Sequence, residues 1–126
     1  MLGAADGESL LAYTSKPERV ARGDEAVLEF TVEIPSDYDS PSLNLTLPAG
    51  LRLVQCEVNT EDSVYFCNDR YNTGSISMWL PKETCTVSIL VRGALPGKYV
   101  VEPIIVADAS NGQYMMTPNA MLEVVE

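Results

Sequence analysis

The side chains best suited to chemistry in this chain are three cysteines, Cys56, Cys67 and Cys85. Their spacing contains no Cys-x-x-Cys pair, so we expect no metal site at them. The chain has no histidine, which removes the commonest general base and the commonest zinc ligand. Neither a Ser-His-Asp triad nor a Cys-His pair can therefore form. We predict that the protein is not an enzyme and has no catalytic, metal-binding or cofactor-binding residues.

The odd number of cysteines limits the chain to one internal disulfide and leaves at least one thiol. Each cysteine lies in a strand-like stretch, where a reduced cysteine behaves as a small hydrophobic residue. Two states remain open: three buried thiols, or one bridge with one free thiol. We favour three buried thiols, because disulfide-stabilised domains usually contain more cysteines than this chain.

Acidic side chains are numerous, but their placement does not build a cation site. Asp37 with Asp39, and Glu61 with Asp62, are close neighbours in polar loop stretches. Calcium takes roughly six to eight oxygen ligands, commonly from several clustered acidic residues. These pairs supply too few ligands, so we expect solvated loops at both places.

Two short motifs have a functional and a structural interpretation. Arg22-Gly23-Asp24 spells the tripeptide that integrins recognise on a displayed loop, but we favour a simple turn into the next strand, with glycine supplying backbone freedom. Asn44-Leu45-Thr46 fits the N-glycosylation sequon, and we interpret it as polar alternation within a strand.

The charge and hydropathy of the chain exclude several classes of partner. Its net charge is −10 and it has no basic cluster, so nucleic acid and anionic membranes would repel it. No apolar run approaches the roughly 18 residues that a membrane helix needs, and Met1 does not open a Lys/Arg-led signal peptide. We expect no direct membrane insertion. Both ends are abrupt, so we also expect a piece of a longer protein.

The stretch from Thr84 to Ala109 organises the predicted fold. In its first half, alternate apolar residues fall on one face: Cys85, Val87, Ile89 and Val91. Its second half, Tyr99 to Val106, is apolar on both faces except at Glu102 and Pro103. Leu95-Pro96-Gly97 lies between the halves and has turn chemistry. We predict that the two halves form the central hairpin of the core.

Shorter alternating stretches predict the remaining strands. Their apolar positions are Leu28, Phe30, Val32 and Ile34, then Leu43, Leu45 and Leu47, and then Ile76, Met78 and Leu80. No 3.6-residue period persists, and turn residues recur about every ten residues. We therefore predict an all-β, antiparallel, immunoglobulin-like β-sandwich with about eight or nine strands. Residues 9–126 form its single domain, and 1–8 form a flexible N-terminal segment.

Aromatic and methionine side chains are the candidates for contact with a partner. Trp79 falls on the face opposite Met78 and Leu80, where an exposed aromatic could stack on a sugar or anchor a protein. We favour burial of Trp79 in the core, because large aromatics are usually mostly buried. Met115-Met116 and Met121 could form an adaptable contact surface, and we again favour core packing.

Four segments resemble a known family when they are taken in order. They are Gly23-Asp24-Glu25-Ala26-Val27-Leu28, Leu47-Pro48-Ala49-Gly50-Leu51, Asp62-Ser63-Val64-Tyr65-Phe66 and Arg92-Gly93-Ala94-Leu95-Pro96-Gly97-Lys98-Tyr99. This order resembles the C-terminal, macroglobulin-like domain of bacterial α2-macroglobulin-like proteins. The resemblance covers roughly residues 9–126 and rests mainly on the order and spacing of turns.

The resemblance implies a non-catalytic domain of a large extracytoplasmic protease inhibitor, either periplasmic, at the cell surface or secreted. The domain would pack beside the thioester domain, and its partners would be neighbouring domains and, through the parent protein, target proteases. The thioester motif Cys-x-Glu-Gln is absent, since Cys56 precedes Glu57-Val58-Asn59. Bacterial relatives often carry a Met-Tyr pair where this chain has Ala109-Ser110, so the role of that loop stays open.

The alternative is a bacterial cell-surface adhesion or carbohydrate-binding β-sandwich that uses exposed loops and aromatics such as Tyr38. Both hypotheses require an interface. The candidate interface residues are Tyr71, Trp79, Ala109, Ser110, Tyr114 and Met115.

Overall fold

The computed structural model describes residues 13–15, 17–34, 38–67, 74–110 and 112–126. The predicted flexible segment at 1–8 lies outside these residues. The described part contains no helix that is long and apolar enough to span a membrane. This part contains strands β1 (Tyr13–Ser15), β2 (Arg19–Ala21), β3 (Glu25–Val32), β4 (Asp39–Thr46), β5 (Leu51–Asn59), β6 (Val64–Cys67), β7 (Ser75–Trp79), β8 (Cys85–Gly93), β9 (Gly97–Val101), β10 (Ile104–Ala109), β11 (Gly112–Met116) and β12 (Ala120–Val125).

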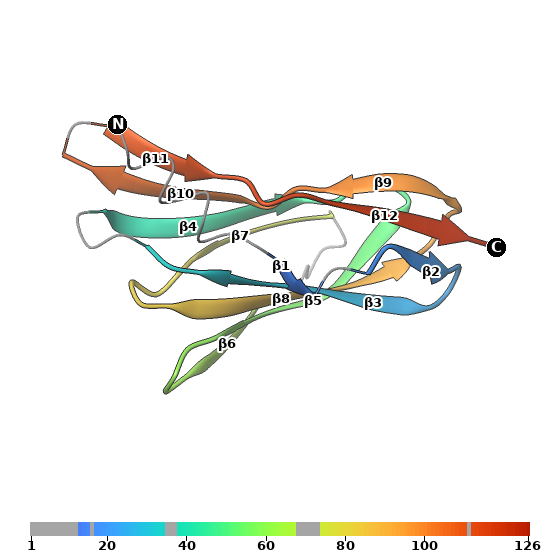
Figure 1. Ribbon diagram of the computed structural model, residues 1–126, viewed down its shortest axis with the longest axis horizontal. Helices are drawn as coiled ribbons and strands as arrows, with labels where there is room; N and C mark the ends of the chain where they lie inside the picture. The colour runs from blue at the N-terminus through green and yellow to red at the C-terminus, as the bar shows by residue number, and fades with distance from the viewer. Residues whose placement is uncertain (1–12, 16, 35–37, 68–73, 111) are drawn as a thin grey trace.

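Strand β8 lies at the centre of the first layer, whose strand order is β1-β3-β8-β5-β6 (Figure 1). It pairs antiparallel with β3, from Glu25 opposite Arg92 to Val32 opposite Cys85. It also pairs antiparallel with β5, whose register shifts once between Leu53 and Gln55. Both edges of β8 are therefore occupied by neighbouring strands.

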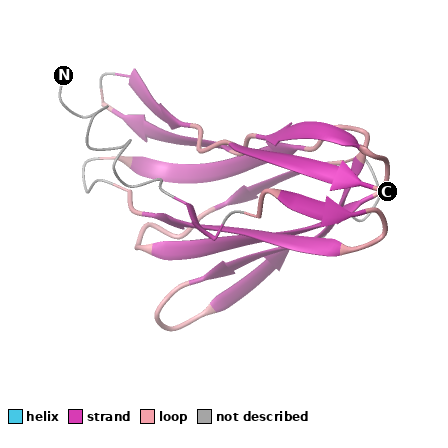
Figure 2. Cartoon of the chain, turned by 45° about the vertical axis from the view of Figure 1, so that its right-hand side comes forward, coloured by secondary structure: helices cyan, strands magenta, loops and turns pink. Residues whose placement is uncertain are grey.

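The second layer is made of two sheets that continue one another end to end (Figure 1; Figure 2). Their strand orders are β11-β10-β4-β7 and β2-β12-β9. The chain passes from β9 to β10 and from β11 to β12 through short breaks that contain Pro103 and Pro118. Proline has no backbone N–H to donate to a neighbouring strand. The two prolines therefore separate β9 from β10 and β11 from β12 at the same level of the layer.

The first two strands tie the layers together at one edge. β1 pairs antiparallel with β3 in the first layer, whereas β2 pairs parallel with β12 in the second. Pro17 lies between β1 and β2, and it cannot donate a backbone hydrogen bond that would continue the pairing of β1 with β3. The chain therefore changes layers within a few residues.

Apolar side chains from alternate positions fill the space between the layers. Leu28, Phe30 and Val32 of β3 are fully buried, and so are Val87, Ile89 and Val91 of β8. The second layer contributes Leu43, Leu45, Ile105, Val101 and Leu122. The predicted inward faces of these strands are confirmed, and so is the prediction of an all-β antiparallel sandwich. Ile34 and Met78, predicted to be inward as well, pack against this core while only half-buried.

The predicted central hairpin is wrong, because β8 and β9 belong to different layers. Both edges of β8 are already bonded to β3 and β5, so β9 has no free edge there and pairs with β12 instead. The apolar stretch from Tyr99 to Val106 is also not one strand, since Glu102 and Pro103 separate β9 from β10. This division and the short strands at the N-terminus raise the number of strands in the described part to twelve.

The turn between β8 and β9 is an arch across the two layers, and Tyr99 holds it closed. The Tyr99 hydroxyl donates to the Leu95 carbonyl oxygen at 2.8 Å and lies 3.3 Å from that of Pro96. A tyrosine that bonds back to backbone a few residues upstream is the tyrosine corner of immunoglobulin-type sandwiches. The Leu95-Pro96-Gly97-Lys98-Tyr99 segment therefore carries the chain from one sheet to the other.

The arch packs directly on the turn before β5. The backbone N–H groups of Ala94 and Leu95 both donate to the Gly50 carbonyl oxygen, at 2.9 and 3.1 Å. The Tyr99 ring occupies the space beside Gly50, where a Cβ would lie 1.8 Å from the tyrosine oxygen. Two of the four segments that carry the family resemblance thus meet at one structural contact.

Candidate binding face

Trp79 is exposed, and the prediction that it lies in the core is wrong. Its relative exposure is 73%. Met78 and Leu80 turn toward the core, so strand alternation directs Trp79 to the outer side of its sheet. Tyr71, the other aromatic among the candidate residues, lies outside the described part of the chain. Tyr38, an exposed loop aromatic in the alternative adhesion hypothesis, packs partly buried against the core.

The strand register places Trp79 and Met115 in one row across the four-stranded sheet of β11, β10, β4 and β7. Trp79 is opposite Ser42, Ser42 is opposite Val106, and Val106 is opposite Met115. Residues directly opposite one another point to the same side of a sheet. Leu43 and Ile105, the next residues along, are fully buried, so the row lies on the outer side. We call it the Trp79–Met115 row.

The two ends of this row are its most exposed members. Met115 is 61% exposed at one edge of the sheet and Trp79 is 73% exposed at the other. Val106 and Ser42 between them are half-buried. The prediction that Met115 and Met121 pack in the core is wrong, since Met121 is also 58% exposed. Three inter-strand steps separate the ends, which is a span of about 14 Å. The row is therefore wide enough to contact several groups of one ligand.

Polar side chains on the same outer side flank the Trp79–Met115 row. On one side of it, the Ser77 hydroxyl donates to Asn44 Oδ1 at 2.7 Å, and a hydrogen bond of 3.1 Å joins the Thr46 and Ser75 hydroxyls. On the other side, Lys82 Nζ donates to Asp39 Oδ1 at 2.6 Å. These bonds hold the polar groups in fixed positions on a hydrogen-bonded sheet.

Asn44, the candidate glycosylation residue, belongs to this polar group. It is half-buried within β4 and opposite Ser77. The predicted polar alternation along this strand is confirmed, since Leu43 and Leu45 on either side of it are buried.

The remaining candidate residues lie in the β10–β11 hairpin. Ala109 is opposite Gly112 at the end of the ladder, and Ser110 is exposed in the turn. Tyr114 is opposite Ala107. The structure therefore brings Ala109, Ser110, Tyr114 and Met115 into one hairpin, and it places Trp79 at the opposite edge of the same sheet.

Sequence analysis missed a second exposed apolar segment at strand β6. Val64, Tyr65 and Phe66 are 50%, 46% and 59% exposed. β6 is the edge strand of the first layer, and the β5–β6 hairpin splays away from the second layer (Figure 1; Figure 2). The signal in the sequence is that Val64–Cys67 is short and lacks the charged residues that usually protect an edge strand.

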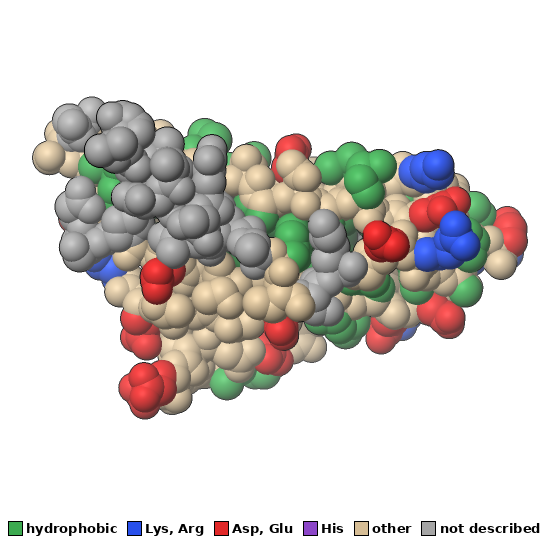
Figure 3. All heavy atoms as spheres, in the orientation of Figure 1, with side chains coloured by type: hydrophobic (Ala, Val, Ile, Leu, Met, Phe, Trp, Pro, Cys, Tyr) green, Lys and Arg blue, Asp and Glu red, His purple; other side chains and the backbone are tan. Residues whose placement is uncertain are grey.

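The charged side chains of the described residues form no metal site and no basic patch. Groups of three or more metal-ligating side chains are absent from this part of the chain, although Asp37, one of the predicted loop carboxylates, lies outside it. Figure 3 shows acidic side chains scattered over the visible face and basic ones mainly at its right-hand end. Four of the basic side chains in the described part form ion pairs, as in Arg92 with Glu25 at 2.6 Å and Arg19 with Glu123 at 3.3 Å.

The Arg22-Gly23-Asp24 tripeptide is the turn that we favoured from the sequence. It connects β2 to β3, and Gly23 has a φ of 92°, a left-handed conformation that glycine adopts without strain. The Gly23 N–H donates to the Gly93 carbonyl oxygen at 2.8 Å and the Asp24 N–H to that of Ala21 at 3.0 Å. Arg22 forms an exposed ion pair with Glu126 at 3.6 Å.

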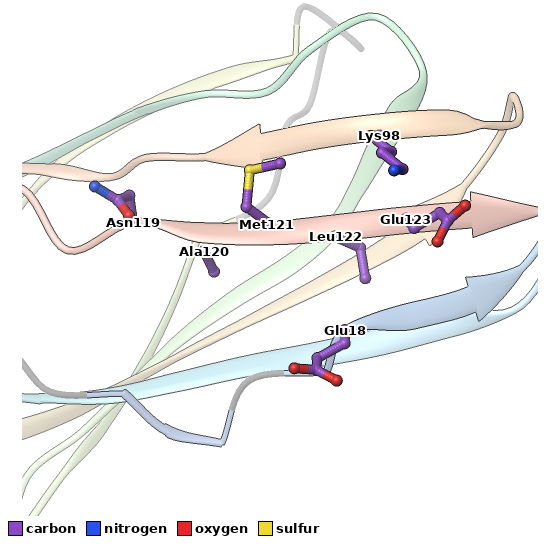
Figure 4. A pocket seen from close by; sticks show the side chains of 7 residues that line it. All are labelled: Glu18, Lys98, Asn119, Ala120, Met121, Leu122 and Glu123. Carbon is purple, nitrogen blue, oxygen red and sulfur yellow. The ribbon is translucent and has the colours of Figure 1, made fainter.

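A shallow depression lies beside β12, away from the Trp79–Met115 row (Figure 4). Its lining residues come from β12, from β9 and from the residues just before β2 and β12; they are Glu18, Lys98, Asn119, Ala120, Met121, Leu122 and Glu123. Glu123 is engaged by Arg19, and the lining contains no aromatic side chain. It offers fewer strong contact groups than the Trp79–Met115 row.

Comparisons with known proteins identify the fold of this chain but do not assign it to a family. No protein-family model matches the chain, and no curated protein matches it. The collagen-binding domain of a Staphylococcus aureus adhesin is similar in structure, with a TM-score of 0.56 and 8% identity over 90% of this chain and 97% of that one. A structure titled BspA_C_mut has a TM-score of 0.53 and 12% identity, over 86% of this chain and 42% of that one. At these identities the likeness establishes the β-sandwich fold alone.

Proposed function

We propose that this protein is a non-catalytic binding module of the adhesion type, and that the Trp79–Met115 row is its contact surface. The observation that carries the proposal is the 73% exposure of Trp79, the single tryptophan of the chain, in the same row as the exposed Met115. Large apolar side chains that line up on one outer sheet face are typical of an interaction site.

The chemistry of the row suits contact with a protein or a glycan. Tryptophan gives a large rigid surface at low cost in conformational entropy and is enriched among residues that dominate binding energy. Methionine adapts its shape to irregular partners. The Asn44–Ser77 pair adds polar groups beside the aromatic ring, which can fix the orientation of a bound ligand.

The fold and the charge are compatible with this role. The same sandwich fold occurs in the collagen-binding domain of the staphylococcal adhesin. A net charge of −10 disfavours nucleic acid and anionic membranes as partners. An adhesion module would act outside the cytoplasm, so we place this protein at the cell surface or in a secreted assembly.

Fluorescence of Trp79 provides a direct test. We would titrate the protein with collagen and with a panel of soluble oligosaccharides, and measure acrylamide quenching with and without each probe. A probe that binds the row should reduce quenching of Trp79. The affinity of each probe for the variants is measured by isothermal titration calorimetry, because Trp79→Ala removes the single tryptophan of the chain. Trp79→Ala should weaken binding of that probe by at least about tenfold, as truncation of a dominant contact residue does.

Two variants make the test specific. Met115→Ala lies in the row and should weaken binding, whereas Met121→Ala removes a methionine of similar exposure, 58%, from β12 and should not. Unchanged affinity in Trp79→Ala would contradict the proposed surface. Failure of every probe to bind or to protect Trp79 would count against adhesion.

The second candidate is the C-terminal domain of an α2-macroglobulin-like inhibitor. It is favoured by the exposed apolar residues at both the Trp79–Met115 row and β6, since a domain packed within a larger protein buries such patches against its neighbours. Reading the gene on both sides of this segment tests it. A long frame with a bait-like stretch and a Cys-x-Glu-Gln motif supports this candidate, and a frame of tandem sandwiches contradicts it.

A further inference from the structure

Two of the three cysteines face each other across the β5–β6 ladder. Cys56 is directly opposite Cys67 in this antiparallel pair. Residues in that position have Cα atoms about 4.5–5.5 Å apart and side chains on the same side of the sheet. Disulfides join Cα atoms about 4.4–6.8 Å apart, so the backbone already meets the requirement for a bridge.

The third cysteine is out of reach of this pair. Cys56 is opposite Ile89 in β8, and Cys85 lies four residues before Ile89 on the same strand. A strand rises about 3.3 Å per residue, which puts Cys85 about 13 Å along from the level of Cys56. The fold therefore permits one pairing among the three.

We propose that Cys56 and Cys67 form a disulfide when the protein meets a disulfide oxidant such as glutathione disulfide, and that Cys85 remains a thiol. In the structure all three are free thiols, with Cys56 and Cys85 buried and Cys67 half-buried. The favoured expectation of three thiols is thus the reduced state, and the bridge is the oxidised state of the same fold.

The reaction balances through a mixed disulfide. The Cys67 sulfur, which is the accessible one, attacks glutathione disulfide and expels one glutathione thiolate. The Cys56 sulfur then attacks the Cys67 sulfur and expels the second glutathione. The two cysteine thiols lose two electrons and two protons in total, and glutathione disulfide is reduced to two glutathione molecules.

Burial governs when the second step occurs. Desolvation raises the pKa of the Cys56 thiol to about 12, so this group is a neutral, weak nucleophile in the closed hairpin. We expect the bridge to form readily during folding and slowly in the native protein. It would close the hairpin that carries the exposed Val64, Tyr65 and Phe66, and so restrain the free edge of the first layer.

Peptide mapping tests the pairing. The full chain is refolded from urea, and separately incubated in its native state, in a glutathione-disulfide buffer; free thiols are then alkylated in urea. Trypsin leaves both cysteines in the segment 53–70, and a glutamate-specific protease cuts between them after Glu57 and Glu61. We expect the two fragments to stay joined until a reductant is added, with Cys85 alone alkylated in the refolded sample.

Two variants supply matched controls. Cys67→Ser should leave two alkylated thiols under the same conditions, and Cys85→Ala should leave none, because the bridge persists. The proposal would be overturned by any of three results in the refolded wild type: three alkylated thiols, a fragment joined to Cys85, or glutathione retained on Cys67. The wild-type map decides the question even if a variant fails to fold.

Discussion

Replacing Gly50 with alanine should be among the most damaging small changes in this protein. A Cβ at this position would lie 1.8 Å from the Tyr99 oxygen and 2.2 Å from the ring carbon that bears it. Gly50 is not among the glycines with a positive φ, so the cost is steric and not conformational. The ring must move, and its hydrogen bond to the Leu95 carbonyl oxygen at 2.8 Å must break.

The magnitude follows from these two losses. Overpacking a well-packed site costs about 1–3 kcal/mol, and the lost hydrogen bond adds about 1 kcal/mol. We expect Gly50→Ala to lower the free energy of unfolding by about 2–4 kcal/mol, a large part of the roughly 5–15 kcal/mol that a domain of this size has. Urea unfolding should be followed by far-ultraviolet circular dichroism, because Trp79 is exposed in the native state and reports unfolding poorly.

A double-mutant cycle tests the cause. In a Tyr99→Ala background the ring is gone, so Gly50→Ala should cost less than about 0.5 kcal/mol, and the coupling energy should equal most of the single-variant loss. Gly23→Ala is the control: nothing lies within 4 Å of its Cβ position, and its φ of 92° makes its cost independent of Tyr99. Equal costs for Gly50→Ala in both backgrounds would refute the steric explanation.

For three further perturbations the structure fixes whether stability rises or falls, and urea unfolding measures each change. Ser40 has a φ of 53° at a register shift of β4, so Ser40→Gly should stabilise the fold by about 1 kcal/mol; a loss of stability would contradict the strain. The Tyr13 hydroxyl is buried with no hydrogen-bond partner among the described residues, so Tyr13→Phe should be neutral or stabilising by up to about 1 kcal/mol. A decrease in the free energy of unfolding would show that the hydroxyl has a hydrogen-bond partner. Burial raises the pKa of Cys56 from 9.0 to about 12 and that of Cys85 to about 11. Because the unfolded chain loses these protons first, the stabilising contribution of the two thiols should be constant up to about pH 9 and fall as pH rises from there toward 12. Cys56→Ala should flatten that fall, and an unchanged slope would contradict the assignment.

Alternation along single strands was predictable from the sequence, and pairing between distant strands was not. Leu28, Phe30 and Val32 were placed on the buried side correctly, because a period of two needs only local information. The central hairpin failed because a Pro-Gly turn suits an arch between sheets as well as a hairpin. What decides between them is that β3 and β5 occupy both edges of β8, and this is a long-range property.

The candidate site divides in the same way. The alternation of Trp79 with Met78 and Leu80 indicates that it is exposed, whereas the general tendency of tryptophan to be buried predicts the opposite. The alignment of Trp79 with Met115 depends on the order β7-β4-β10-β11, which joins segments more than 30 residues apart in sequence. No local pattern contains that information.

The contact between Gly50 and Tyr99 also bears on how the family resemblance should be weighed. The Pro-Ala-Gly turn and the Pro-Gly-Lys-Tyr segment are two of its four segments, and the structure uses both to build one arch between the layers. Any sandwich that crosses its sheets with a tyrosine corner is under the same packing constraint. These motifs therefore report how the chain folds, and they do not by themselves indicate what it binds. Trp79 and Met115 belong to none of the four segments, so the proposed contact surface can be tested independently of the resemblance.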